Sequence, residues 1–379
     1  MDLGEIRAKI DKVDDTILDA FLQRMALSDE VAKYKKENSM AIYNKTRERE
    51  ILAKVTDRSG DMERYSYHLF STLFGLSRAR QEELLSGESG VKKLIDRGIQ
   101  NGAEVFPQTG TIACQGVEGA NSQEACDKLF PRGKLMYLKS FEAVFVAVSS
   151  GLCKYGVVPI ENSANGSVRA VYDLLQAKNF SIVRSIRLFI HHELMVKPGT
   201  KMSDVKEIYS HEQALGQCSE FLSKLGPGVK VIPCDNTAMA AELVANSEGN
   251  SRAAISSHRC AKLYGLETIN SHIQNSENNY TRFICIANKP EIYAGANHIS
   301  LVIACDNKPG ALYEILARLS VAGVNMSKLE SCPVTGSNFE FIFFLELDAS
   351  VHEPGVLAML EELERTCESF TFLGNYAEV

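Results

Sequence analysis

The segment YGVVPIENSANGS, residues 155–167, decides the fold class of the middle of the chain, because an apolar strand ends there in a polar loop that contains glycine. Residues 111–122 repeat this form, and residues 209–213 lead from a third strand into a helix. Short β-branched runs alternate with helical patterns from about Pro107 to Pro290, which predicts an α/β domain. Ligands bind at the carboxyl ends of strands in such domains, so we expect a binding site at these junctions.

The segments on either side of this domain have different residue patterns, which predict different secondary structure. No glycine or proline occurs between Glu5 and Arg58, which predicts helices. After Asn297 the order strand, helix, strand, strand, helix, strand resembles a ferredoxin-like α+β fold. These elements are expected at residues 299–304, 311–322, 324–329, 339–347, 354–365 and 370–373. We therefore expect a multidomain chain with a helical domain (1–88), a linker (89–108) that is loosely structured from Gly98 to Pro107, an α/β domain (109–288) and a C-terminal domain (297–379).

A heptad pattern predicts that the helical domain is shared between two chains. Its seam steps by three and four through Leu3, Ile6, Ile10, Val13, Ile17, Ala20, Arg24, Leu27, Val31 and Tyr34. A helix from Leu3 to about Lys36 would be about 50 Å long. A domain of under 100 residues is too small to cover it, so we expect a homodimer or a dimer of dimers.

Cations interrupt these apolar faces. Arg24 is the charged member of the seam, and it requires either a carboxylate of the partner chain or a carboxylate of a ligand. Arg7 and Lys35 share a second stripe but lie about 42 Å apart on one helix. If both serve one site, an antiparallel partner helix must bring Arg7 of the other chain to Lys35.

Two further helices add polar groups to inward faces. Asn44 is a plausible N-cap for a helix that carries Glu48 on its apolar stripe, with Arg47 at the edge of the stripe. A third helix has Ser77 and Gln81 on an otherwise apolar face. The domain thus gathers guanidinium, ammonium, carboxylate, hydroxyl and amide groups.

With residues 6–11 and 47–50, this set resembles the all-helical chorismate mutase family over nearly all of residues 1–88. The resemblance assigns substrate contacts to Arg7 of the partner chain, Arg24, Lys35, Asn44, Arg47, Glu48, Ser77 and Gln81. Lys35 and Gln81 would donate to the ether oxygen, and Glu48 would hold the ring hydroxyl. A pericyclic rearrangement needs only a folded substrate and fixed donors at the developing negative charge. Asn44 stands where the family often has Asp, so we expect reduced rather than abolished activity if that position matters.

The middle domain resembles the prephenate dehydratase family over residues 110–287. Its motifs are VPIENS at 158–163, Ser210 and His211 followed by Gln217, and Thr281-Arg282-Phe283. The resemblance implies two α/β lobes around a cleft, similar to periplasmic binding proteins. Thr281 would donate a hydrogen bond to the departing ring hydroxyl while the carboxylate leaves as CO2. The residues expected to position the substrate are Glu161, Asn162, Ser163, Gln217, Arg282 and Phe283.

The Thr-Arg-Phe motif lies in a predicted strand, which limits how its side chains can share one site. Neighbouring side chains of a strand point to opposite faces. Thr281 and Arg282 can therefore share a site only if the site lies at the start of the strand.

The C-terminal domain resembles the amino-acid-sensing ACT domain in residues 306–312 and 329–333. The resemblance implies that L-phenylalanine is an effector, bound by Gly310, Ala311, Leu312, Glu330 and Ser331. A carboxylate suits the helix N-terminus beside Gly310. Cys332 stands where the family usually has Arg and cannot supply that cation.

Composition excludes other classes of protein. The chain has 45% hydrophobic and 23% charged residues and a net charge of -7, without the basic stripe of a nucleic-acid binder. Neither a signal peptide nor a membrane span is expected, and the ten cysteines form no CxxC pair, which favours reduced thiols in the cytoplasm. We expect no metal and no organic cofactor.

The leading interpretation is an enzyme that converts chorismate to prephenate and prephenate to phenylpyruvate, under feedback by phenylalanine. The first alternative is a monofunctional prephenate dehydratase with a vestigial mutase domain used for dimerisation. The second is a metabolite sensor without catalysis. The intact Thr281-Arg282-Phe283 motif argues against the sensor.

Overall fold

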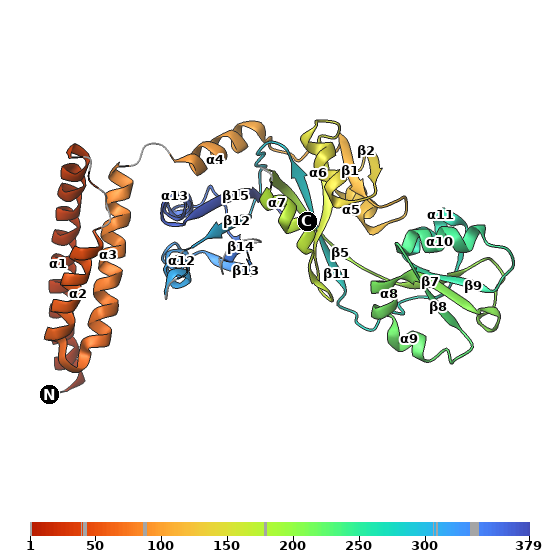
Figure 1. Ribbon diagram of the computed structural model, residues 1–379, viewed down its shortest axis with the longest axis horizontal. Helices are drawn as coiled ribbons and strands as arrows, with labels where there is room; N and C mark the ends of the chain where they lie inside the picture. The colour runs from red at the N-terminus through yellow and green to blue at the C-terminus, as the bar shows by residue number, and fades with distance from the viewer. Residues whose placement is uncertain are drawn as a thin grey trace. The chain divides into compact units, whose positions relative to one another are not determined.

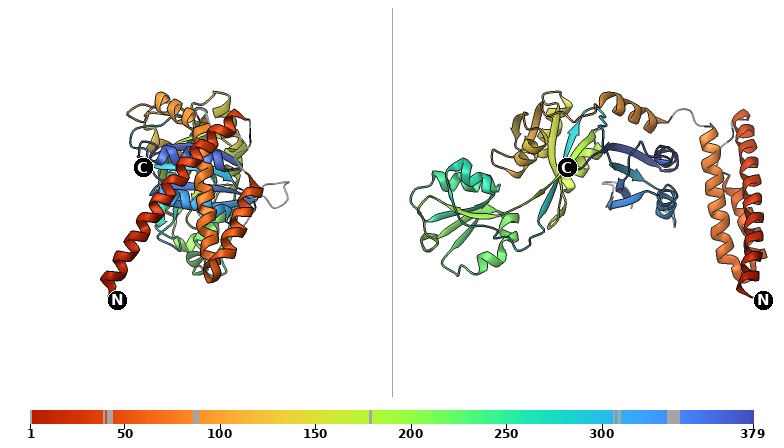
Figure 2. Two further views of the ribbon diagram at one scale, coloured as in Figure 1. Left: turned by 90° about the vertical axis from the view of Figure 1, so that its left-hand side faces the viewer. Right: turned by 180° about the vertical axis from the view of Figure 1, so that it is seen from behind.

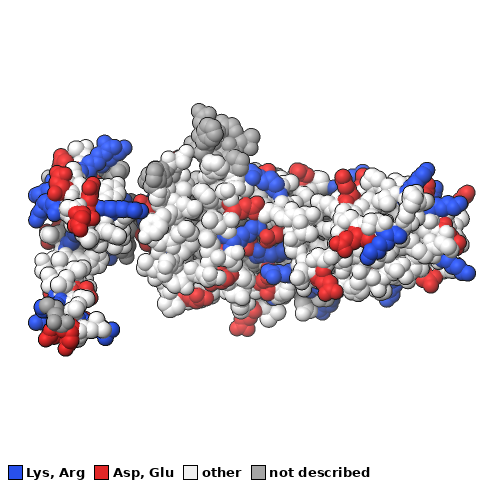
Figure 3. Space-filling model, turned by 90° about the horizontal axis from the view of Figure 1, so that it is seen from below, with Lys and Arg blue, Asp and Glu red and all other residues white. Residues whose placement is uncertain are grey.

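The computed structural model describes residues 2–38, 40, 44–85, 89–177, 180–305, 307, 310–333 and 341–379 (Figure 1). The chain forms two compact units. The first comprises Met1–Lys93 and Leu357–Glu368, and the second comprises Leu94–Val356 and Ser369–Val379. Among the described residues, no helix combines the length and the apolar character needed to cross a membrane. Acidic and basic side chains are interspersed on the face in Figure 3.

Three helices make up most of the first unit. They are α1 (Leu3–Glu37), α2 (Lys45–Ser59) and α3 (Glu63–Leu85), with a short 3-10 turn at Gly60–Met62. Asp2 caps α1 in a capping box with Glu5, which fixes the first turn. The predicted helix from Leu3 to about Lys36 is confirmed.

Most of α1 is exposed within a single chain. Its buried residues, Ser28 and Ala32, both lie in its C-terminal third. The seam residues Ile10 and Ile17 are 52% and 58% exposed. Figure 2 shows the first turns of α1 extending away from α2 and α3. An apolar stripe of this length in water is costly unless a second surface covers it.

The first sheet of the second unit has the strand order β2-β1-β3-β11-β5, and β4 pairs with β3 at its side. Its strands are β1 (Thr111–Gln115), β2 (Lys134–Leu138), β3 (Tyr155–Asn162), β4 (Gly166–Ser167), β5 (Ser181–Phe189) and β11 (Tyr280–Ala287). Strands β1, β2 and β3 are parallel, and β11 runs antiparallel to both β3 and β5. The helices between these strands are α5 (Asn121–Leu129), α6 (Phe141–Ser149) and α7 (Arg169–Ala177).

The second sheet has the order β10-β6-β9-β7-β8. Its strands are β6 (Glu193–Val196), β7 (Glu207–His211), β8 (Lys230–Cys234), β9 (Arg252–Ser256) and β10 (Glu267–Asn270). Its helices are a 3-10 turn (Met202–Asp204), α8 (Glu212–Gln217), α9 (Ser219–Ser223), α10 (Thr237–Asn246) and α11 (His258–Tyr264). The chain enters this sheet after β5 and returns to the first sheet through β11. The predicted two-lobed α/β domain is confirmed.

A third, antiparallel sheet has the order β13-β14-β12-β15. Its elements along the chain are β12 (His298–Ala304), α12 (Ala311–Val321), β13 (Asn325–Pro333), β14 (Phe341–Asp348), α13 (Val356–Thr366) and β15 (Ser369–Tyr376). The predicted order of strands and helices is confirmed, although residues 339 and 340 of the expected third strand lie outside the described residues.

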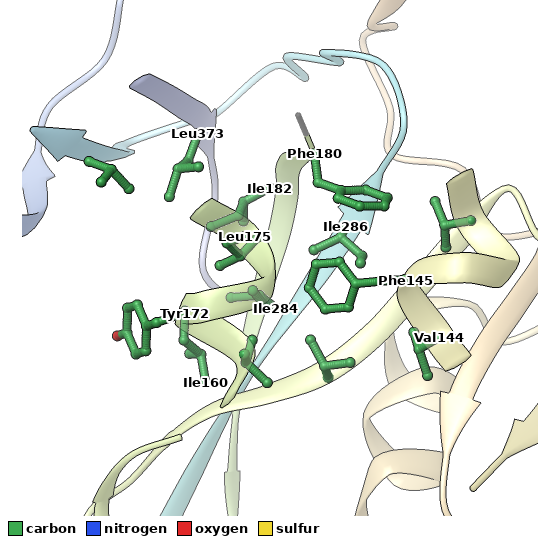
Figure 4. Packing of buried hydrophobic residues seen from close by; sticks show 14 of the residues in the cluster. Val144, Phe145, Ile160, Tyr172, Leu175, Phe180, Ile182, Ile284, Ile286 and Leu373 are labelled. Carbon is green, nitrogen blue, oxygen red and sulfur yellow. The ribbon is translucent and has the colours of Figure 1, made fainter. Parts of the chain in front are cut away.

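The first and third sheets share one hydrophobic core (Figure 4). Tyr172 of α7 meets Phe344 of β14 edge to face, with ring centroids 4.4 Å apart. Leu373 of β15 lies beside Ile182 and Leu175 in the same cluster. Removing a buried aromatic side chain such as Phe344 typically costs about 3–5 kcal/mol, so these two sheets stabilise each other.

One segment differs from expectation. Residues 98–107 were expected to be loosely structured, but helix α4 spans Gly90–Asn101 and buries Ile95. The glycines that suggested a loop instead permit close packing. Ile292 N donates to Gly98 O at 2.8 Å, and a Cβ on Gly102 would lie 1.8 Å from Ile292 O.

Candidate active sites

In the helical unit, Arg24 is held against α3. Its Nη1 donates to Leu73 O at 2.9 Å and to the hydroxyl of Ser77. Its guanidinium also lies over the Phe74 ring, 5.4 Å from the centroid. Ser28 Oγ donates to Ser77 Oγ at 3.1 Å. These contacts fix a half-buried cation on the inner face of α1.

Lys35 repeats this arrangement three turns further along α1. Its Nζ donates to Gln81 Oε1 at 3.0 Å. Burial lowers the pKa of both Lys35 and Arg24, and the carboxylate of Glu48 partly offsets that effect. The structure therefore brings together five predicted residues, which are Arg24, Lys35, Glu48, Ser77 and Gln81.

Glu48 has a partner that sequence reasoning missed. Arg78 Nη1 lies 2.5 Å from Glu48 Oε1 and 2.6 Å from Oε2. Arg78 follows Ser77 directly and so occupies a different face of α3, which meets α2. A helical-wheel comparison of α2 and α3 could have revealed this pair.

Three other predicted residues lie apart from this cluster. Arg7 is exposed, about 25 Å along α1 from Arg24. Arg47 is also exposed and pairs with Glu50 at 3.4 Å. Asn44 Oδ1 accepts from Arg47 N at 3.0 Å, so Asn44 is the N-cap of α2, as predicted.

In the second unit, β3 and β11 set the position of Thr281. Thr281 pairs in register with Asn162. Asn162 Nδ2 donates to Thr281 Oγ1 at 2.9 Å and to Asn279 Oδ1 at 3.0 Å. Asn162 Oδ1 accepts from Ala164 N and Asn165 N, which holds its amide in one orientation. Because Thr281 Oγ1 accepts here, its own hydrogen is available to another acceptor.

Gln217 extends this network to the second sheet. Its Oε1 accepts from Asn279 Nδ2 at 2.8 Å and lies 2.7 Å from His192 Nε2. Burial lowers the pKa of His192, which favours the neutral ring, and a hydrogen on Nε2 suits the accepting Gln217 Oε1. A continuous hydrogen-bond network thus joins Thr281, Asn162, Asn279, Gln217 and His192. Sequence reasoning missed Asn279 and His192, although Asn279 lies two residues before Thr281.

Two predicted residues contribute to the framework behind this network. Ser163 Oγ donates to Asn278 O at 2.6 Å and accepts from Tyr280 N at 2.9 Å. Phe283 is 2% exposed and packs in the core of the first lobe. Both hold β11 and its preceding loop against β3.

Glu161 and Arg282 contact the third sheet. Glu161 Oε2 lies 3.1 Å from Lys328 Nζ. Arg282 Nε lies 2.7 Å from Glu378 Oε2, and its Nη1 forms an ion pair with Glu346. The alternation of side chains along β11 separates Arg282 from Thr281.

The first glycine-containing loop, 115–122, has a structural explanation. Gly116 and Gly119 have φ values of +106° and +89°. A Cβ on Gly119 would lie 2.8 Å from Cys260 Sγ of α11. Gly119 N already donates to Gln123 Oε1, at 2.6 Å. These glycines serve a turn and the close contact with α11.

The expected effector residues lie on α12 and β13. Gly310, with φ of +88°, precedes Ala311 and Leu312 at the N-terminus of α12. Glu330 of β13 accepts from Ser167, and the neighbouring Ser331 is exposed. Residues 306, 308 and 309 of this motif lie outside the described residues.

Cys332, the departure from the family pattern, is 1% exposed. It packs in the core shared by the first and third sheets. Its thiol replaces an expected cation with a small apolar group, which suits that core.

Comparison with known proteins relates both units to enzymes. Residues 6–82 match the family model "Chorismate mutase type II", and residues 112–291 match "Prephenate dehydratase". The chain is 30% identical over 377 residues to the bifunctional chorismate mutase/prephenate dehydratase of Escherichia coli K12, covering 98% of this chain and 95% of that protein.

Two further relatives match a smaller share of the chain. Arogenate dehydratase/prephenate dehydratase 2 of Arabidopsis thaliana, a chloroplastic protein, is 33% identical over 294 residues, which are 74% of this chain and 75% of the relative. The solved structure of the Arthrobacter aurescens prephenate dehydratase in complex with L-Phe is 28% identical, with a TM-score of 0.64, covering 70% of this chain and 89% of that one.

Proposed function

The chain belongs to the bifunctional chorismate mutase/prephenate dehydratase family, and on that premise we propose which of its residues perform the two reactions. It rearranges chorismate to prephenate and then converts prephenate to phenylpyruvate, two steps of phenylalanine synthesis. The observation that carries the assignment is the pair of polar clusters around Arg24 and Thr281, one within each matched segment.

In the mutase reaction, Arg24 binds a carboxylate of chorismate, with Ser77 beside it. Lys35 and Gln81 donate to the ether oxygen as its bond to carbon breaks, and Glu48 holds the ring hydroxyl. The Lys35–Gln81 contact of 3.0 Å supports this division, because it joins the two donors in one small region. Fixed donors of this kind stabilise developing charge without reorganisation.

Arg7 and Arg47 complete the mutase site when two chains associate. The exposed seam of α1 supports an antiparallel pairing of the α1 helices in a homodimer, which can pair further into a dimer of dimers. Sedimentation of the purified protein tests this assembly, and a monomer at micromolar concentration would contradict it.

In the dehydratase reaction, Thr281 donates a hydrogen bond to the departing hydroxyl of prephenate while CO2 is lost. Asn162 orients Thr281 by donating to its oxygen, and Gln217 positions the substrate from the second lobe. Aromatisation makes the reaction strongly downhill, so orientation and one directed donor suffice.

L-phenylalanine regulates the enzyme through Gly310, Ala311, Leu312, Glu330 and Ser331. The complex of the Arthrobacter relative with L-Phe supports this proposal, as does the helix N-terminus beside Gly310. Millimolar phenylalanine should shift the thermal midpoint or the dehydratase rate, and an unchanged protein would contradict regulation.

We infer a cytoplasmic location from the free thiols of all ten cysteines. Reduced thiols in this number are typical of a reducing compartment. Cell fractionation followed by immunoblotting tests this inference.

The first experiment is incubation of the purified protein with chorismate, with prephenate and phenylpyruvate followed by chromatography. Phenylpyruvate is the expected final product. Conversion of added prephenate without conversion of chorismate would instead indicate a dehydratase with a silent helical domain.

A further inference from the structure

The two strands that carry Thr281 and Asn162 present a second row of residues to the third sheet. In the antiparallel pair β3–β11, Thr281 is opposite Asn162 and Arg282 is opposite Glu161. Successive side chains alternate between the faces of a sheet. The row Thr281–Asn162 therefore lies on one face, and the row Arg282–Glu161 lies on the other.

Charges of opposite sign from the third sheet and from the chain that follows it meet this second row. Lys328 of β13 pairs with Glu161 at 3.1 Å, and its side chain is 14% exposed. Glu346 of β14 and Glu378 pair with Arg282, whose side chain is 9% exposed. Arg282 Nη2 also donates to Tyr376 Oη at 3.2 Å. Buried charges with this many partners hold one geometry, since losing any partner leaves a charge uncompensated.

The chain after β15 reinforces this joint. Val379 N donates to Ser185 O at 3.0 Å, and Ser185 N donates to Ala377 O at 3.0 Å, so residues 377–379 lie along β5. Glu378 also pairs with Arg187 of β5 at 2.8 Å. Strand β5 is the neighbour of β11, so Glu378 is fixed from two sides.

We propose that Lys328, Glu346 and Glu378 are positioning residues of the dehydratase reaction, which hold Glu161 and Arg282 and thereby set Thr281 and Asn162 for catalysis. This inference rests on the proposed role of Thr281. It assigns Glu161 and Arg282 to the joint with the third sheet instead of to the substrate. The third sheet is then part of the catalytic framework in addition to any role in sensing.

The test measures kcat and KM for prephenate in the full-length variants Glu378→Gln and Lys328→Gln. Displacing a reacting group slightly slows the chemical step more than it weakens binding. We expect kcat to fall about tenfold or more with KM changed less than about threefold. The matched control is Asp173→Asn, which breaks the exposed Asp173–Arg169 pair on α7 and should leave kcat unchanged. Each variant's mutase rate and thermal midpoint report on folding.

A double variant separates positioning from substrate binding. If Glu161 acts through Lys328, the variant E161Q/K328Q should be no slower than K328Q alone. The inference would be overturned if the losses in kcat from E161Q and K328Q multiplied in the double variant. A change in KM alone, or a wild-type kcat in both E378Q and K328Q, would also overturn it. Dehydratase activity that survives Thr281→Val would instead overturn the proposed function, so the two failures are distinguishable.

Discussion

In the helical unit, one chain leaves an apolar seam exposed and holds Arg7 far from Arg24, whereas in the second unit one chain closes a hydrogen-bond network around Thr281. The chemistry explains the difference. A rearrangement needs a shell of fixed donors around the substrate, which a second chain can help to build. An elimination depends on one directed hydroxyl, which local hydrogen bonds within a chain can aim. The comparison teaches that assembly should control the first reaction and local geometry the second.

Among these variants, Thr281→Val should produce the largest difference between the dehydratase rate and the mutase rate. We expect a loss of about 100-fold or more in the dehydratase kcat, because the departing hydroxyl loses its donor. The mutase rate should not change. Thr281→Ser is the matched control, since it keeps the hydroxyl. A dehydratase loss of less than tenfold in Thr281→Val would contradict the assignment.

Mixing two inactive variants tests the shared mutase site. Arg7→Ala and Lys35→Ala should each lower mutase kcat/KM by about 100-fold, since each removes a charged contact of the proposed site to the transition state. In mixed dimers one of the two sites is intact, so mixing should restore about a quarter of wild-type activity. Recovery requires exchange of chains, which dilution and reconcentration allow. Without recovery in verified mixed dimers, the proposal that Arg7 of one chain and Lys35 of the other share one site would be wrong.

The two sites should also differ in their response to alkali. Burial lowers the pKa of Lys35, and the role proposed for Lys35 needs the charged ammonium. The mutase kcat/KM should therefore fall as pH rises through this lowered pKa, earlier than for an ordinary lysine. Lys35→Arg should remove that alkaline limb, because arginine stays charged. The dehydratase profile serves as the internal control, and an alkaline limb unchanged in the arginine variant would contradict the role of Lys35.

The smallest effect is expected at Asn44. As an N-cap it is equivalent to Asp, so Asn44→Asp should change stability and mutase rate little. Asn44→Ala should destabilise the helical unit by about 1 kcal/mol. Chemical unfolding followed by circular dichroism measures this cost. A large rise in mutase rate with Asp would show that the missing charge matters.

The sequence predicted those helices and strands that are determined by residues close together in the chain. The helix over residues 3–37 follows from a long stretch without proline and from its heptad pattern, and the C-terminal order follows from clear strand and turn signals. Helix α4 was missed because Gly98 and Gly102 resemble loop residues until the packing of Ile292 against them is known.

The candidate sites were predictable to a similar extent. The resemblance to prephenate dehydratases pointed to Asn162, Gln217 and Thr281, which the structure brings into one network. Strand alternation predicted that Arg282 and Thr281 point to opposite faces unless the site lies at the start of the strand. Its partners Glu346 and Glu378 lie 64 and 96 residues further along the chain (346 - 282 and 378 - 282), and no local pattern connects such positions.

The core shared by the first and third sheets has a consequence for how such genes can recombine. A regulatory domain that is connected only by a linker, without a shared core, can be exchanged between relatives by fusion at the linker. Here a transplanted third sheet would have to bring matching partners for Tyr172, Glu161 and Arg282, or leave apolar surface and charge exposed. The dehydratase lobe and its third sheet should therefore be inherited as one piece, and chimeras cut between β11 and β12 should be less stable than either parent.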